Sequence, residues 1–263
     1  MSEQKETIGR TLGVALAVCL VCSVFVAGAA VSLKPIQQEN ALLDKQRSVL
    51  RVAGMIPEDA SGAEVRKVFR EGIVARVVDL ETGRFSDAQD PRSYDPLKAA
   101  QDPQTSRVLP PGTDIASIHR QEHYSLAYMV EKGGKVETLV LPVRGYGLWS
   151  TLYGFIALDS DLKTVKGFGF YQHAETPGLG GEVDNPRWLA QWPGKQVYDD
   201  SGRFDLVMLK GGGANDGTPQ AVHRVDAIAG ATLTSRGVEH LLQFWLGPNG
   251  FGPFLQNLRK GEA

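Results

Sequence analysis

The chain begins with a long apolar run and then alternates between polar segments and short apolar ones. Residues 11–33 contain no charged side chain and consist mostly of Val, Ala, Leu, Cys and Phe. As a helix they extend about 34 Å, which is enough to cross the hydrocarbon core of a bilayer with some tilt. This pattern predicts one N-terminal transmembrane helix. The alternative is a cleaved signal peptide, with loose cleavage candidates at Ala27-Gly28-Ala29 and Ala29-Ala30-Val31.

Three later segments have the pattern of helices. Residues 36–53 are rich in helix-forming side chains and precede Gly54 and Pro57, so we expect a juxtamembrane helix there. Residues 58–69 predict a second, shorter helix. Near the C-terminus, apolar residues recur at i, i+3, i+4 and i+7, which predicts an amphipathic helix over 236–246 that ends at Gly247-Pro248.

Short apolar segments bounded by turn residues predict the strands. They lie at 73–80, 124–130, 136–143, 152–158 and 165–171, with turns at 81–83, 133–134 and 145–147. Residues 87–112 hold many prolines and polar residues, so we expect a long surface excursion without regular structure. Consecutive strands joined by short turns favour an antiparallel sheet with flanking helices. The predicted fold is therefore α+β, preceded by one transmembrane helix.

Composition excludes several classes of function. The formal charge is 28 − 30 = −2 and no basic run stands out, which argues against nucleic acid as a partner. No strand is followed by G-x-G-x-x-G, and the P-loop order is absent, so neither an NADH site nor nucleotide hydrolysis is supported. The five histidines show no metal spacing, and no catalytic triad is evident. We therefore expect no catalytic residue and no metal ligand in this chain.

The two cysteines, Cys19 and Cys22, both lie within the predicted span. Their C-x-x-C spacing has too few ligands for a zinc site of its own. They are either inert packing residues or part of a metal site shared with other subunits. The remainder of the chain has no cysteine and hence no disulfide.

Small and hydroxyl-bearing residues crowd into one segment before the C-terminal helix, Asp226-Ala227-Ile228-Ala229-Gly230-Ala231-Thr232-Leu233-Thr234-Ser235. Gly230 and Ala231 let a ligand approach the backbone closely. The hydroxyls lie beside the unpaired amides of a helix start, and such amides attract phosphate. The simpler interpretation is that Thr234 or Ser235 caps the helix, and the two interpretations are compatible.

The order Asp226, three residues, Gly230-Ala231-Thr232, one residue, Thr234 resembles the flavinylation motif of the FMN-binding domain family. In that family a flavin transferase joins FMN, through its phosphate, to the hydroxyl of the last Thr. The resemblance implies covalent FMN as cofactor, attached by a phosphoester to Thr234. It also implies contacts from the surrounding motif residues, namely Asp226, Ala229, Gly230, Ala231, Thr232 and Ser235. Family members often carry Ser at the position of Ala229, where only a backbone contact is expected.

A second segment, His173-Ala174-Glu175-Thr176-Pro177-Gly178-Leu179-Gly180-Gly181, predicts by itself only a sharply turning loop. It resembles the Glu-Thr-Pro-Gly segment that lies against the flavin in the same family. The resemblance implies ring or ribityl contacts from Glu175, Thr176, Gly178, Leu179 and Gly180.

Two further segments are open to two interpretations each. The first is Arg144-Gly145-Tyr146-Gly147-Leu148-Trp149. In one interpretation its aromatic residues pack in the core. In the other, which the family resemblance implies, Leu148 and Trp149 form a wall beside the flavin. Lys210, before three glycines, either offsets the phosphate charge or is a solvated side chain in a loop.

Within this family the chain is similar to the C subunits of sodium-translocating NADH:quinone reductases, in its single span, its length and both motifs. The resemblance implies an electron relay, in which covalent FMN takes one electron from a neighbouring subunit and passes it on, while the whole complex oxidises NADH, reduces ubiquinone and exports Na⁺. The implied partners are the other membrane subunits, a flavin transferase for maturation and the lipid bilayer. Two alternatives are the G subunit of the Rnf complex and a membrane-anchored sensory or scaffolding domain without a redox role.

Charge counts around the span do not decide its orientation, since lysines and arginines lie on both sides of it. The family resemblance implies a short cytoplasmic N-terminus at 1–10, a transmembrane helix at 11–33 and an extracytoplasmic FMN-binding domain at 34–263. The large domain would then lie on the periplasmic side of a bacterial inner membrane.

Overall fold

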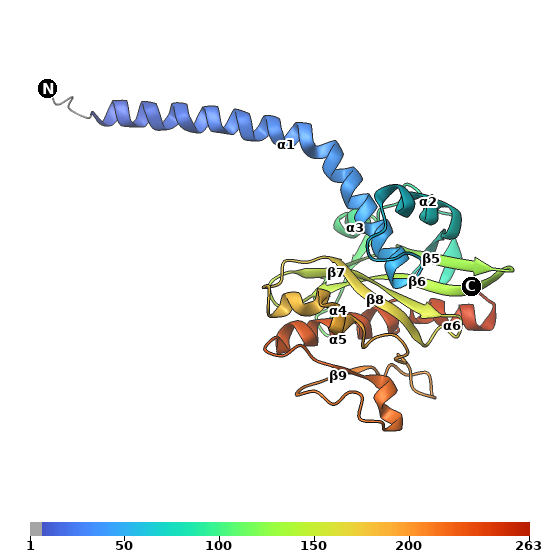
Figure 1. Cartoon of the computed structure of the whole chain (residues 1–263). Helices are drawn as coiled ribbons and strands as arrows, with labels where there is room; N and C mark the ends of the chain where they lie inside the picture. Colours follow the sequence, from blue (N-terminus) through green and yellow to red (C-terminus); the bar gives the residue numbers. More distant parts are fainter. Residues whose placement is uncertain (1–6) are drawn as a thin grey trace. The chain divides into compact units, whose positions relative to one another are not determined.

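The computed structural model describes residues 7–263 and divides the chain into two compact units, Met1–Asp44 and Lys45–Ala263. The first unit is mostly helix α1, which runs from Ile8 to Val52 and continues into the second unit (Figure 1). By length and composition, α1 is the one helix among the described residues that could cross a membrane. Residues 1–6 of the expected N-terminal segment 1–10 lie outside the described residues.

Helix α1 corrects one boundary. The sequence predicts two helices, 11–33 and 36–53, whereas the structure has one helix that contains Pro35. A proline removes one backbone donor and crowds the preceding turn, but the bonds on either side of it remain. The helix therefore continues through the position where the composition changes from apolar to polar.

The second unit is built on a six-stranded antiparallel sheet in the order β2-β1-β5-β6-β7-β8. The strands are β1 (Val74–Asp79), β2 (Arg84–Ser86), β5 (Tyr124–Lys132), β6 (Lys135–Tyr146), β7 (Thr151–Asp159) and β8 (Val165–Gln172). The five strands predicted from the sequence are confirmed, and β2 is an addition to them. The α+β fold class is also confirmed.

Helices cover both faces of this sheet (Figure 1). Helices α5 (Thr232–Leu246) and α6 (Gly252–Lys260) pack on one face, in a core that includes Leu141, Ile156 and Trp245. The last turns of α1 and helix α2 (Gly62–Gly72) cover the other face, in a smaller core with Val140 and Phe155. Helix α6 is not among the helices predicted from the sequence.

Two predicted segments differ from the structure. Helix α2 begins at Gly62 rather than at residue 58, because the Ser61 hydroxyl accepts the Glu64 amide at 3.2 Å and caps the helix there. The expected excursion 87–112 contains a short helix, α3 (Pro96–Gln101), and strand β3 (Ser106–Val108), which pairs with β4 (Arg120–Glu122). Asp95 starts α3 by accepting the amide of Leu97 at 3.1 Å, so polar and Pro-rich composition here marks caps as well as loops.

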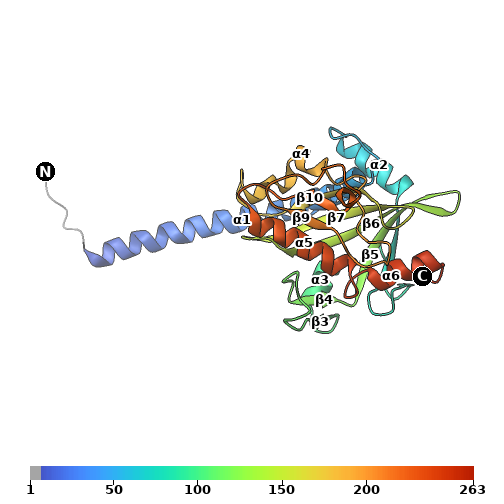
Figure 2. The ribbon, with the colours of Figure 1, turned by 90° about the horizontal axis from the view of Figure 1, so that it is seen from below.

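Short elements connect the sheet to the C-terminal helices. They are η1 (Gly180–Asp184), α4 (Pro186–Leu189), η2 (Pro219–His223) and the parallel pair β9 (Val207–Leu209) and β10 (Arg224–Asp226). Figure 2 shows β9 and β10 beside α5. The Met208 amide donates to the Glu239 carboxylate at 2.8 Å, which ties β9 to α5. Strand β10 leads directly into the segment that carries Thr234.

Two glycines bring α5 close to the end of β6. A methyl group at Gly237 would lie 2.5 Å from the Tyr146 carbonyl oxygen, and one at Gly145 would lie 2.5 Å from Cβ of Leu241. The sequence predicts a turn at 145–147, but Gly145 lies within β6. The turn begins at Gly147, whose amide donates to the Ser150 carbonyl at 2.8 Å. This packing places the first turn of α5 beside the β6–β7 turn.

Candidate functional site

The carboxylate of Glu175 lies at the centre of the candidate site and is almost fully buried, at 4% exposure. Its Oε1 accepts the amides of the β6–β7 turn, from Leu148 (3.1 Å), Trp149 (3.0 Å) and Ser150 (3.0 Å), and the Ser150 hydroxyl at 3.2 Å. Burial by itself raises the pKa of Glu175, but the hydrogen bonds outweigh it and hold the pKa below its ordinary value. Glu175 is therefore ionised at neutral pH.

The other carboxylate oxygen, Oε2, accepts the hydroxyl of Thr234 at 2.8 Å. Thr234 lies in the first turn of α5 and is fully buried, at 0% exposure. The two residues are 59 positions apart in the sequence. The structure thus brings together one residue from each of the two motifs identified in the sequence.

Two glycines make room for this pair. A methyl group at Gly180 would lie 2.6 Å from both Oε2 of Glu175 and Oγ1 of Thr234. A methyl group at Gly147 would lie 2.7 Å from Oε1 of Glu175. Contacts this short do not occur for real Cβ atoms, so both positions need glycine for the carboxylate to stay where it is.

Sequence reasoning missed two residues that hold Glu175 in place, Ser150 and His173. The Ser150 hydroxyl accepts the Ala174 amide at 2.8 Å while it donates to Glu175. Nδ1 of His173 accepts the Glu175 amide at 3.2 Å, so the ring proton is on Nε2, which lies 2.7 Å from the Asp184 carboxylate. Ser150 directly follows one of the glycine-rich segments that the sequence singles out, and His173 is the first residue of the other, so position is the signal that could have found them.

Helix α5 begins earlier than predicted, at Thr232, and its N-cap residue is Ala231, which makes no side-chain cap. The interpretation of Thr234 or Ser235 as the N-cap is therefore wrong. Ser235 instead accepts the Ile228 amide and donates to the Ala231 carbonyl, both at 3.0 Å, which closes the loop before the helix. The amides of residues 232–234 precede the first helical hydrogen bond, that of the Ser235 amide to Ala231, and residues 232 and 233 are exposed, so the helix start offers donors to an anion.

Asp226 has a supporting position at this loop. Its Oδ1 accepts the Ala214 amide at 2.7 Å, and its carbonyl accepts the indole of Trp188 at 2.9 Å. It therefore anchors the glycine loop that contains Lys210 next to the motif. Lys210 itself is exposed, and its loop continues through three glycines with positive φ, Gly211, Gly212 and Gly213.

The remaining predicted residues are exposed and lie in the segments that carry the buried pair and in the β6–β7 turn; we call them the rim. Trp149 is 68% exposed, and Leu148 and Leu179 are also exposed, as is Leu233, which the sequence did not predict. Leu179 reaches Gly230, where a methyl group would lie 3.3 Å from its Cδ2. Exposed positions on the same loops are Thr176, Gly178, Ala229, Gly230 and Thr232. An apolar rim around a buried polar centre is typical of a ligand site, and the packing of Trp149 in the core is excluded.

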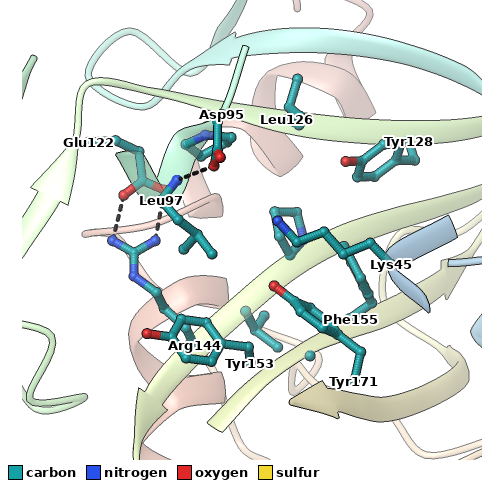
Figure 3. Close-up of a pocket in the computed structure, with 14 residues that line it drawn as sticks. Lys45, Asp95, Leu97, Glu122, Leu126, Tyr128, Arg144, Tyr153, Phe155 and Tyr171 are labelled. Carbon is teal, nitrogen blue, oxygen red and sulfur yellow. Dashed lines mark hydrogen bonds and ion pairs between the residues drawn. The ribbon is translucent and has the colours of Figure 1, made fainter. Parts of the chain in front are cut away.

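A separate pocket lies on the sheet face that carries α2 (Figure 3). Aromatic rings line it, those of Tyr128, Tyr153, Phe155 and Tyr171, with Lys45 pointing into it. At its edge Arg144 forms a two-armed ion pair with Glu122, at 2.9 and 2.6 Å. None of the predicted site residues lines this pocket, so it is distinct from the Glu175–Thr234 site.

Known proteins share the segment that carries the candidate site. A family model described as "FMN-binding domain" matches residues 147–247, from the β6–β7 turn to the end of α5. This range includes Glu175, Thr234 and every other predicted site residue. The site is therefore built from the segment that matches the FMN-binding domain.

Full-length relatives extend the comparison beyond that domain. The chain is 62% identical over 263 residues to the C subunit of the Na(+)-translocating NADH-quinone reductase of Pseudomonas aeruginosa, covering 100% of both chains. It is 43% identical to the Vibrio alginolyticus protein of the same name, covering 100% of this chain and 99% of the other. The crystal structure of Shewanella oneidensis NqrC matches with a TM-score of 0.75 at 36% identity, covering 86% of this chain and 99% of that one. The chain therefore belongs to the family of Na⁺-translocating NADH-quinone reductase C subunits.

Proposed function

We propose that the chain carries FMN as an electron-transfer subunit of a Na⁺-translocating NADH-quinone reductase complex. The observation that carries this function is the coincidence of the Glu175–Thr234 site with the FMN-binding match at 147–247, within full-length similarity to C subunits. This full-length similarity favours a C subunit over the G subunit of an Rnf complex and over a scaffolding domain. When bound, FMN supplies one-electron redox chemistry, and the protein supplies its position and surroundings.

FMN is held, in this proposal, by a phosphoester to the Thr234 hydroxyl. The chemistry of the site fits such a group, because the amides at the start of α5 can donate to phosphate oxygens. The absence of a side chain at Gly230 leaves the backbone of the same loop open to a close approach. Asp226, Ala231 and Ser235 would support this loop from within.

The exposed rim suits the flavin ring. An isoalloxazine ring has apolar faces and polar edges, so it requires apolar walls and a few hydrogen-bonding groups. Trp149, Leu148 and Leu179 would supply the walls, together with Leu233, which the sequence analysis did not include. The exposed Thr176, Thr232 and Lys210 would contact the polar parts of the cofactor. Because the rim faces outward, the ring is open to the approach of a neighbouring subunit for electron transfer.

The membrane arrangement follows from α1 and from the family. Residues 11–33 would span a bacterial inner membrane once, with residues 1–10 in the cytoplasm and the domain 34–263 on the periplasmic side. The partners are then the lipid bilayer, the other membrane subunits of the complex and a flavin transferase that attaches FMN. A covalent link prevents loss of the cofactor from a domain outside the cytoplasm.

The covalent nature of the cofactor is testable with the full chain, produced with and without a flavin transferase. We expect a yellow protein only with the transferase, and a band that still fluoresces under ultraviolet light after electrophoresis in denaturing detergent. Flavin that separates from the chain on denaturation would contradict the covalent link. A chain without flavin under both conditions would support the scaffolding alternative instead.

A further inference from the structure

We propose that Glu175 is the proton acceptor for the attachment of flavin to Thr234, so that this chain contributes the general base for its own modification. The inference rests on the proposed covalent attachment at Thr234. It adds a role for a second residue in that step, and it predicts a rate and a pH dependence that a purely structural role for Glu175 does not.

The geometry divides the two carboxylate oxygens between two tasks. Oε1 accepts three amides and one hydroxyl from the β6–β7 turn, which fixes the carboxylate in position. Oε2 accepts the Thr234 hydroxyl at 2.8 Å, within the distance that direct proton transfer requires. A carboxylate that served only to hold the turn would need Oε1 alone.

The same geometry distinguishes Thr234 from its neighbours. The Ser235 hydroxyl already donates to the Ala231 carbonyl and accepts the Ile228 amide. Thr232 is exposed, and no carboxylate hydrogen bond to it occurs among the described residues 7–263. Thr234 is therefore the hydroxyl of this segment that has a base in contact with it.

The step can be written with all atoms accounted for. The donor is a flavin dinucleotide, in which the FMN phosphorus is activated as a phosphoanhydride. Oγ1 of Thr234 forms a bond to that phosphorus, the phosphoanhydride P–O bond breaks, and its electron pair leaves with the nucleoside monophosphate. The hydroxyl proton passes to Oε2 of Glu175 and then to water, and no atom changes its oxidation state.

A weakly basic carboxylate is suited to this role. Phosphoryl transfer passes through a loose transition state, in which the attacking hydroxyl loses its proton late, and protein kinases use an Asp carboxylate in this position. The hydrogen bonds that lower the pKa of Glu175 keep it ionised, and hence able to accept a proton, at neutral pH.

Burial of Thr234 places a condition on the step. With 0% exposure, Oγ1 can meet a donor only after a neighbouring segment moves, and Gly180 lies directly against it. The segment 176–179 ahead of Gly180 is exposed and outside regular structure. If it moves aside, the amides of the β6–β7 turn still hold Glu175.

The test uses the full chain, purified without flavin, with purified flavin transferase, Mg²⁺ and flavin adenine dinucleotide. Covalent flavin is measured by mass spectrometry at timed intervals across a range of pH. We expect Glu175→Gln to lower the initial rate by about 10²- to 10⁴-fold, the usual contribution of a general base. The ratio of wild-type to variant rate should fall as the pH rises, because hydroxide replaces the missing base; this ratio cancels the pH dependence of the transferase itself.

Glu182→Gln is the matched control, since Glu182 lies in the following η1 segment and bonds to Asn185. It should react at the wild-type rate.

Two results for Glu175→Gln would overturn the proposal. One is a wild-type rate with wild-type pH dependence. The other is a slower rate with unchanged pH dependence, which indicates a structural role. If Glu175→Gln fails to fold, Glu175→Ala tests the same point through chemical rescue: formate added to the reaction should restore part of the rate by replacing the missing base, and a rate that formate does not change would overturn the proposal. A wild-type chain that takes up no flavin contradicts the proposed function itself and not this step alone.

Discussion

Replacing Thr234 with alanine is expected to abolish covalent flavin while the protein still folds. The substitution removes the hydroxyl that contacts the buried Glu175 carboxylate from α5. It also leaves Oε2 of Glu175 without that partner, which costs about 1–3 kcal/mol. The four hydrogen bonds to Oε1 remain, so the carboxylate stays ionised and in place. Flavin fluorescence in a denaturing gel and thermal unfolding measure the two effects separately.

Thr232→Ala is the matched control for this substitution. Thr232 lies two residues earlier at the same helix start and is exposed, whereas Thr234 is buried. If accessibility alone selected the modified residue, Thr232 would be preferred. We expect Thr232→Ala still to carry flavin on Thr234, in an amount reduced only by the contact that the Thr232 hydroxyl would make with the cofactor. Flavin on Thr234→Ala, or flavin of Thr232→Ala on a residue other than Thr234, would show that the attachment point is elsewhere.

The second large effect is on stability, at the buried ion pair of Arg144 and Glu122. Glu122 is 1% exposed, and both arms of the Arg144 guanidinium donate to it. Burial alone lowers the pKa of Arg144, but the charge and hydrogen bonds of Glu122 raise it above its ordinary value. Glu122→Ala leaves this charge buried without its carboxylate partner, which costs about 3–5 kcal/mol. For a unit of this size we expect Tm to fall by about 6–20 °C.

A double substitution separates the cost of the unpaired charge from the loss of packing. Glu122→Leu combined with Arg144→Met replaces the pair with apolar side chains of similar volume, and such replacements are often neutral or stabilising. We expect the double variant to recover most of the lost Tm in differential scanning calorimetry. A Glu122→Ala protein that melts at the wild-type temperature would show that the pair is not held as described.

The backbone of Arg144, rather than its ion pair, connects strand β6 to the candidate site. The backbone carbonyl of Arg144 accepts the indole of Trp245 at 2.7 Å, which holds α5 against β6. Tyr146 ends the same strand, and Gly147 begins the turn that binds Glu175. Because these contacts use the backbone, the double variant should still accept flavin below its melting temperature.

Much of the fold could be predicted because its signals are local. Strands β5 to β8 have apolar segments bounded by turns, and α5 has a clear amphipathic repeat. The predicted first residues of α2 and α5 were wrong, because the start of a helix is decided by a few local contacts. At Ser61 a single hydrogen bond caps α2, and at Ala231 no side chain caps α5. The pair β9 and β10 consists of short strands, whose pairing comes from tertiary contacts rather than from pattern.

The two segments of the candidate site could be identified in the sequence, but the geometry that joins them could not. The two motifs identify Glu175 and Thr234, yet no local pattern shows that residues so far apart share a hydrogen bond. The role of Ser150 depends on the turn after β6, which the sequence places two residues too early. The packing of Gly237 against Tyr146 sets the distance between the two motifs, and such a close approach becomes visible only in three dimensions.

Covalent FMN on Thr234 is tested most directly by the intact mass of the full chain purified from cells that contain its flavin transferase. We expect the mass of the polypeptide plus FMN minus one water, with the added mass on the proteolytic peptide that contains Thr234. A bare polypeptide from a chain that is otherwise folded and assembled, or a flavin on a different peptide, would contradict it.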